Sequence, residues 1–194
     1  YVIAVAFGYY VLRDKSWLYD IKQCWAGYPN AKIDSGVWSY YVFSLGYYYA
    51  LICCHFFEAR RKDFYEMLLH HVITISLLVF SFIAGIHRVG SLILFLHDTA
   101  DIPLHLSKML IYLKWKRSCD AVFSLFAITW IVTRCVIFPF WVVRNLIEHA
   151  ASLDSFYPLY AAINCLNVLL SILHYFWLYF ILRIIVKTAV KGEM

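Results

Sequence analysis

Long apolar runs alternate with short charged segments along most of the chain. A helix that crosses a bilayer needs about 20 mainly apolar residues, and five runs reach that length, at residues 37–57, 64–86, 91–112, 121–143 and 158–183. The run at 1–12 is shorter and is interpreted as the end of a partial span, and the mixed segment 13–36 as a loop or an interfacial segment. The pattern therefore predicts an all-α, polytopic transmembrane helix bundle with five full spans and one partial span.

The composition also indicates a membrane domain. Hydrophobic residues make up 63% of the chain and charged residues 15%, with a mean hydropathy of +0.70, whereas soluble domains average about 25% charged residues. The chain begins at Tyr1 inside an apolar run, so we interpret residues 1–194 as a single domain excerpted from a longer chain. The net charge of +5 is scattered, which favours membrane lipids over nucleic acid as partners.

Basic residues are unevenly divided between the loops on the two sides of the predicted bundle. One side carries the basic residues of 60–62, 114–117 and 183–191, and the other side carries fewer, mixed with acids. The positive-inside rule places the richer side in the cytosol. The turn expected at 87–90 and the loop expected at 146–157 then face the opposite side of the membrane.

Ionisable side chains inside two consecutive predicted spans are the strongest sign of function. His70 and His71 lie in one span, and His97, Asp98 and Asp101 lie in the next. An Asp at membrane depth costs at least about 2.5 kcal/mol on insertion scales, so such groups normally face a protein interior or a cavity and mark chemistry or transport. A short turn joins the two spans into an antiparallel hairpin, so their polar faces can meet. The structural alternative is a network of mutually satisfied buried hydrogen bonds.

The residue types favour metal-free acyl transfer over a di-metal site. Histidines at H-x-x-x-H or H-x-x-H-H spacing can chelate a metal from one helix, but none of the eight histidines lie four residues apart. We therefore expect no metal ligands here. An imidazole can act as a general base or nucleophile near neutral pH, and a carboxylate can orient it. A proton-coupled transporter would also bury Asp and His, but we find no inverted repeat in the sequence.

Two motifs, His70-His71-Val72-Ile73-Thr74 and Leu96-His97-Asp98 followed by Asp101, occur in this order and spacing. Together they resemble the signature of the ceramide synthases, which share the TLC membrane domain, and the resemblance extends from about Arg61 to Lys187. It implies an enzyme of the endoplasmic reticulum membrane that transfers a fatty acyl group from acyl-CoA, its co-substrate, to the amine of a sphingoid base, with no bound cofactor. The catalytic residues that it implies are His70, His71, His97, Asp98 and Asp101. The alternative is a non-enzymatic TLC protein for lipid sensing, lipid transport or membrane-protein biogenesis, which need not keep both motifs.

Four basic residues are further candidates for binding the substrate. Arg134 lies deep in its predicted span, where it either contacts the substrate or forms a buried ion pair. Its depth matches that of Asp101, so we expect the two side chains to be in direct or water-bridged contact. Lys114, Lys116 and Arg117 lie nearer the cytosolic surface and suit the phosphates of CoA. Assembly into a homo- or hetero-oligomer is left open.

Two positions depart from the family pattern, and the catalytic route has two forms. Gly85 stands where the family usually has Asn, and His105 stands where it usually has Glu. Because burial favours the neutral form of an imidazole, His70 should be available as a base. It either accepts the proton of the sphingoid amine or attacks the thioester itself to give an acyl-imidazole.

Overall fold

The computed structural model of this chain describes residues 1–57, 63–150 and 157–191, and all regular secondary structure in these ranges is helical. The elements are α1 Val2–Leu12, η1 Ser16–Leu18, η2 Ile21–Trp25, α2 Ser35–His55, α3 Phe64–Ile83, α4 His87–Tyr112, α5 Lys116–Trp130, η3 Ile131–Val143, α6 Arg144–Ala150 and α7 Tyr157–Lys191. The prediction of an all-α fold is confirmed.

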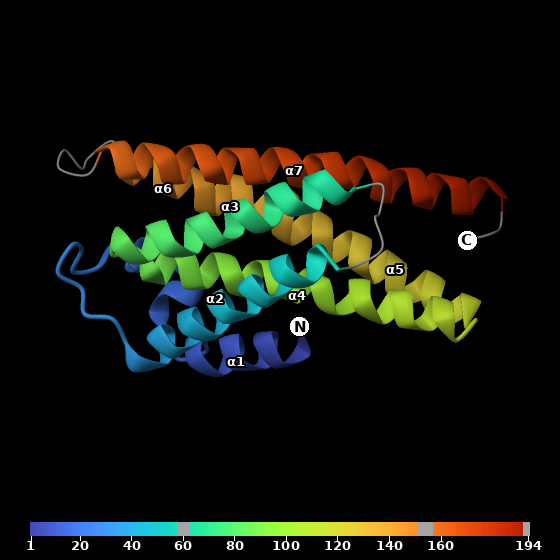
Figure 1. Cartoon of the computed structure of the whole chain (residues 1–194), viewed down its shortest axis with the longest axis horizontal. Coiled ribbons are helices and arrows are strands. Elements are labelled where there is room, and N and C mark those ends of the chain that lie inside the picture. The colour runs from blue at the N-terminus through green and yellow to red at the C-terminus, as the bar shows by residue number, and fades with distance from the viewer. Residues whose placement is uncertain (58–62, 151–156, 192–194) are drawn as a thin grey trace.

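The long helices lie side by side along the longest axis of the molecule (Figure 1). α4 is central, since it packs against α1, α2, α3, α5 and η3, and α7 closes the bundle against α3 and η3. The main core contains the fully buried side chains of Tyr40, Ile73, Phe138, Leu146 and Tyr160. The helices that carry the sequence motifs therefore face one common interior.

Three helical stretches are long and apolar enough to cross a membrane: Phe64–Ile83, Lys116–His149 and Pro158–Thr188. The expected count of five full spans is not confirmed. α2 is rich in tyrosine, and α4 carries Arg88, Asp98, Asp101 and Lys108, so neither helix has the required hydropathy. The structure thus shows a helical bundle with three candidate membrane spans.

The expected turn at 87–90 is wrong, because α4 already begins at His87. The chain reverses just before it, through Gly85, whose φ of +72° lies in the left-handed region. Glycine adopts this conformation freely and asparagine tolerates it better than most residues. The Gly85 departure from the family pattern therefore preserves the turn.

Two further loop boundaries also differ from expectation. The basic loop expected at 114–120 is mostly the first turns of α5, and the chain turns at Lys114, whose φ is +60°. The loop expected at 146–157 is helical through Ala150, and its remainder at 151–156 lies outside the described residues, as do the basic residues 60–62. Hydropathy locates the apolar stretch of a helix, whereas a helix can continue through polar residues beyond it.

The helical stretch that carries Arg134 is a π-helix at Ile131–Val143. Its hydrogen bonds run from residue i to i+5, a rare geometry that is frequent at functional sites. Pro139 lies inside it and has no N–H to donate. The hydroxyl of Tyr175 on α7 donates to the carbonyl of Cys135, one turn before the proline, at 2.9 Å. A side chain from a neighbouring helix thus satisfies a carbonyl in the irregular segment.

Candidate active site

His97 is held at the centre of the bundle by contacts from three helices. Its Nδ1 lies 2.7 Å from the carbonyl oxygen of Ile93, one turn earlier on α4, which fixes the plane of the ring. The ring centroid lies 4.8 Å from that of Phe138 and 4.9 Å from that of His174. Its Nε2 is buried and has no hydrogen-bond partner among the described residues. A backbone carbonyl therefore orients this imidazole and leaves its second nitrogen available.

His70 and His71 point to different neighbours, as residues about 100° apart on a helix must. His70 faces the interior, with its ring centroid 5.5 Å from that of Trp177 on α7, and its Nδ1 is buried without a partner among the described residues. His71 instead lies 5.8 Å from His55 on α2 and is almost fully buried. Of the two histidines, His70 is the one that faces the cavity described below.

Asp101 and Arg134 form a buried ion pair, as their matching depths predicted. The Nη2 atom of Arg134 donates to Oδ1 of Asp101 at 2.7 Å and to the backbone carbonyl of His97 at 2.9 Å. The two side chains are 5% and 13% exposed, and the guanidinium carbon lies 4.2 Å from the ring centroid of Trp130. Arg134 therefore joins the Asp101 carboxylate to the backbone of His97.

Asp98 is 2% exposed and contacts two tyrosines of α2, apart from the Asp101–Arg134 ion pair. The hydroxyls of Tyr40 and Tyr48 donate to its two carboxylate oxygens, each at a long 3.5 Å. In the described residues, then, the two carboxylates contact hydroxyls and a guanidinium, while the ring of His97 is oriented by a backbone carbonyl. Among the described residues, no hydrogen bond joins either carboxylate to the His97 ring, so the role of Asp98 or Asp101 in orienting a catalytic imidazole stays a prediction.

The remaining basic candidates lie far from these groups. Lys114, Lys116 and Arg117 are exposed at the turn between α4 and α5. Asp101 is eleven residues from Tyr112, the last residue of α4, which corresponds to about 16 Å along the helix. The four basic residues predicted to bind substrate are thus split between one buried ion pair and an exposed cluster at one end of the bundle.

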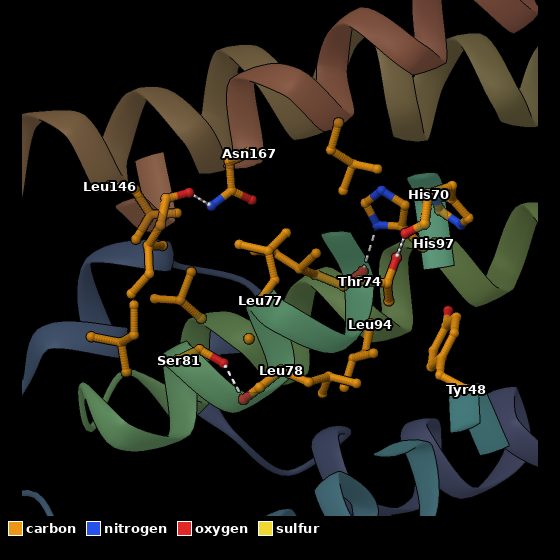
Figure 2. A pocket seen from close by; sticks show the side chains of 16 residues that line it. Tyr48, His70, Thr74, Leu77, Leu78, Ser81, Leu94, His97, Leu146 and Asn167 are labelled. Carbon is orange, nitrogen blue, oxygen red and sulfur yellow. Dashed lines mark hydrogen bonds between the residues drawn. The ribbon is translucent and has the colours of Figure 1, made fainter. Parts of the chain in front are cut away.

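A narrow apolar cavity begins at His70 and His97 and runs between α3, α4 and α7. Figure 2 shows His70, His97 and Tyr48 at one end and Leu146 and Ser81 at the other. The positions of His70 and Ser81 on α3 give a length of about 16 Å. The volume of about 40 Å³ is room for only a few water-sized groups, so the cavity is thin. Its lining residues are Tyr48, His70, Thr74, Leu77, Leu78, Ser81, Ile86, Val89, Gly90, Ile93, Leu94, His97, Leu146, Ile163, Asn167 and Leu170.

The polar groups in the cavity wall are mostly occupied. Thr74 donates to the His70 carbonyl at 2.9 Å, Ser81 donates to the Leu78 carbonyl at 3.1 Å, and Asn167 donates to the Ile163 carbonyl at 2.9 Å. The Oδ1 of Asn167 is buried and has no hydrogen-bond partner among the described residues. Apart from this amide oxygen the wall is mainly hydrocarbon, with imidazole groups concentrated at one end. This arrangement suits an extended alkyl chain whose reactive end lies beside His70 and His97.

Three residues of the site were not predicted from the sequence: His174, Tyr40 and Tyr48. His174 on α7 is fully buried, and both ring nitrogens lack a partner among the described residues. The rule that singled out His97, an ionisable group at membrane depth, applies equally to His174 and could have found it. The tyrosines gave no such signal, because a tyrosine-rich helix is typical of a membrane interface. Within the described ranges no group of three or more His, Cys, Asp and Glu side chains could hold a metal ion.

Comparison with known proteins identifies relatives of this chain. The chain is 36% identical to ceramide synthase 5 of Homo sapiens, 39% to ceramide synthase hyl-1 of Caenorhabditis elegans and 36% to ceramide synthase 4 of Bos taurus. Each alignment covers the whole of this chain but 50%, 56% and 49% of the relative, so the chain spans about half the length of these proteins. The family profile of the TLC domain matches residues 1–183. The chain therefore belongs to the TLC-domain family.

Proposed function

We propose that this domain catalyses the acyl-CoA-dependent N-acylation of a sphingoid base to give a ceramide or dihydroceramide. The observation that carries the proposal is the thin apolar cavity with His70 and His97 at one end. The apolar lining and elongated form of this cavity match a fatty acyl chain, although the cavity would have to widen to admit one. The thioester carbonyl would then lie beside the imidazoles. The similarity to ceramide synthases supports the same substrate class.

In the proposed reaction the amine of the sphingoid base attacks the thioester carbonyl. A C–N bond forms, the C–S bond breaks, and the amine loses a proton. His70 accepts that proton as a general base and returns it to the departing CoA thiolate. In the alternative route His70 attacks first, releases the thiolate, and passes the acyl group to the amine. Both routes need a buried imidazole with an available nitrogen, which describes His70.

The other site residues would position these groups. Arg134 bonds the His97 carbonyl and so holds the backbone beside the imidazole, while Asp101 balances the buried guanidinium. The cation also adds a positive field where negative charge develops on the carbonyl oxygen. Tyr48 lines the cavity and donates to Asp98, so it links that carboxylate to the reacting end. His71 would assist catalysis indirectly, by positioning the adjacent ring of His70.

We further propose that the domain lies in the endoplasmic reticulum membrane as a multi-pass protein. α2 and α4 would cross the bilayer with the three apolar stretches, which makes five full spans, and α1 would be the partial span. Lys114, Lys116 and Arg117 would face the cytosol, where they can contact the CoA phosphates. A glycosylation acceptor inserted at residues 151–156 should be modified and one at Lys114 should not. The opposite result would invert the orientation.

The activity test uses the purified protein with a sphingoid base and a panel of acyl-CoA chain lengths, with N-acylated product measured by mass spectrometry. His70→Ala should lower turnover by at least about a hundredfold, because a general base contributes that much or more. The matched control is His149→Ala, since His149 stacks on Trp25, a residue of η2 outside the cavity lining. Near-full turnover of His70→Ala would overturn the catalytic assignment and favour a non-enzymatic TLC protein.

The same variants separate the two routes. Protein incubated with acyl-CoA alone should gain the mass of an acyl group if His70 attacks the thioester. His70→Ala should not gain it. If neither protein gains the mass while the unaltered chain turns over normally, the general-base route is favoured.

A further inference from the structure

A second cavity lies where α1 ends and α2 and α4 begin. In Figure 1 these helix ends lie at the opposite end of the bundle from the turn between α4 and α5. It is wider than the first, with a volume of about 320 Å³. Its lining residues are Lys15, Trp17, Lys32, Ile33, Asp34, Val37, His87 and Arg88. None of them belongs to the proposed acyl cavity, so this pocket needs an explanation of its own.

The charge of the second cavity is positive. Three of its side chains, Lys15, Lys32 and Arg88, are cationic, and Asp34 is the one acid in the lining. Lys15 Nζ donates to Asp34 Oδ2 at 2.8 Å, so this acid offsets one of the cations. Three cations and one acid leave a net charge of +2, which is opposite in sign and similar in magnitude to the −1.5 to −2 of a phosphate monoester near neutral pH.

The cations are held in place. Nη1 of Arg88 donates to the carbonyls of Gln23 and Ala26, at 3.2 Å and 2.8 Å, and the guanidinium carbon lies 4.9 Å from the ring centroid of Trp17. Lys15 Nζ lies 5.8 Å from the centroid of the same ring. The indole thus holds two cations on one wall of the cavity. Because these side chains are already ordered, little further side-chain entropy is lost when a ligand binds.

Two buried ring nitrogens without a hydrogen-bond partner lie at the same place. The Nε1 of Trp17 and the Nε2 of His87 are buried and have no hydrogen-bond partner in the described ranges. α4 begins at His87, and its N-cap residue Ile86 offers no side-chain acceptor to the first turn. The free N–H groups of a helix N-terminus favour an anion. Cations, indole donor and helix N-terminus therefore converge on one lining.

We propose that this cavity binds the phosphate group of a membrane lipid. Exposed aromatic side chains such as Tyr9, Tyr10 and Tyr19 surround this end of the bundle, as at a membrane–water interface. Ile33 and Val37 add an apolar wall that suits the glycerol and first acyl carbons next to the phosphate. A lipid phosphate therefore fits better than free inorganic phosphate, which would use only the charges.

The test is isothermal titration calorimetry of the purified chain in non-ionic detergent with three probes: dihexanoyl phosphatidic acid, inorganic phosphate and dihexanoyl phosphatidylcholine. Phosphatidic acid should bind saturably and at least about tenfold more tightly than inorganic phosphate. Phosphatidylcholine should bind weakly, because its choline cation meets the basic lining. Equally tight binding of inorganic phosphate would overturn the lipid as the ligand, and no saturable binding of phosphatidic acid would overturn the site.

Three variants locate the binding. Lys32→Gln should weaken the affinity for phosphatidic acid by about fivefold, the effect expected of one partly exposed charge pair. Asp34→Asn should strengthen it by a similar factor, since the amide keeps the helix cap and removes the one negative charge. Lys22→Gln is the matched control, because Lys22 is exposed on η2 outside the lining. Equal weakening by Lys22→Gln and Lys32→Gln would mean diffuse charge attraction and would refute the pocket.

Discussion

The ion pair between Asp101 and Arg134 should be the most sensitive polar contact in the bundle. Both side chains are almost fully buried and share a hydrogen bond of 2.7 Å. Asp101→Leu removes the carboxylate that pairs with the guanidinium, and Arg134→Met removes the guanidinium donor from the carboxylate and also frees the His97 carbonyl. Breaking a buried pair in this way costs about 3–5 kcal/mol.

The double variant should be more stable than either single variant. Replacing a buried ion pair by apolar side chains of similar volume is often neutral or stabilising, because the desolvation penalty of two charges disappears. Methionine can fill the space of the arginine stem beside Trp130. We therefore expect Asp101→Leu with Arg134→Met to lose less unfolding free energy than either change alone.

The assay is equilibrium unfolding of the purified chain in mixed micelles of a mild detergent and SDS, followed by helical circular dichroism. Arg144→Gln in the pair with Glu148 is the matched control, since this i,i+4 pair has a similar length of 2.8 Å but side chains 74% and 56% exposed. Its removal should leave the unfolding curve unchanged within error. Additive losses in the double variant, or single losses no larger than the control, would refute the reasoning.

Three further predictions concern the helix contacts, the pH response and the cavity length. Gly90→Ala should lower the unfolding free energy by about 1–3 kcal/mol, because the added methyl overlaps the Tyr41 hydroxyl, whereas Gly46→Ala, which has nothing within 4 Å, should not. The hydrogen bond from Lys15 lowers the pKa of Asp34, so its stabilisation is present above the unfolded pKa of about 3.9 and lost as pH falls through the lower folded value. The effect is under about 1 kcal/mol for this half-exposed pair, and Asp34→Asn should flatten the acid limb of a stability–pH curve; an unchanged limb would contradict the assignment. Ile163→Phe, near the end of the cavity remote from His70, should shift the product spectrum toward shorter acyl chains; an unchanged spectrum would mean that this cavity does not hold the acyl chain.

Much of the architecture could be predicted, because hydropathy and loop length report directly on burial and adjacency. The short connection at Gly85 required α3 and α4 to be neighbours, and the matched depths of Asp101 and Arg134 predicted their contact, which is confirmed. Both arguments use distances along helices, which the sequence supplies. The number of spans was less predictable, because the hydropathy that marks a span is diluted on α2 and α4 by polar groups that the bundle interior satisfies.

Side-chain direction was harder to predict than helix position. Adjacent histidines on α3 diverge to opposite neighbours, and only the packing of α2 and α7 decides which one faces the cavity. The π-helix that carries Arg134 has no sequence pattern that identifies it, and the hydroxyl that bonds its Cys135 carbonyl comes from α7, which is distant in the sequence. His174 lies on α7, which is distant from α4 in the sequence, so its contact with His97 depends on how the two helices pack.

The hydroxyl groups in the wall of the first cavity already make hydrogen bonds, and this affects whether water or an amine reaches an activated acyl group. Thr74 and Ser81 already donate to backbone carbonyls, so apart from the Oδ1 of Asn167 the wall has few groups that could hold a chain of ordered water. A thioester or acyl-imidazole at His70 would then face competition from water only at the mouth of the cavity. The preference for amide formation over hydrolysis would in this case come from the hydrocarbon wall. A polar substitution in that wall should admit water and increase hydrolysis of the acyl donor to free fatty acid.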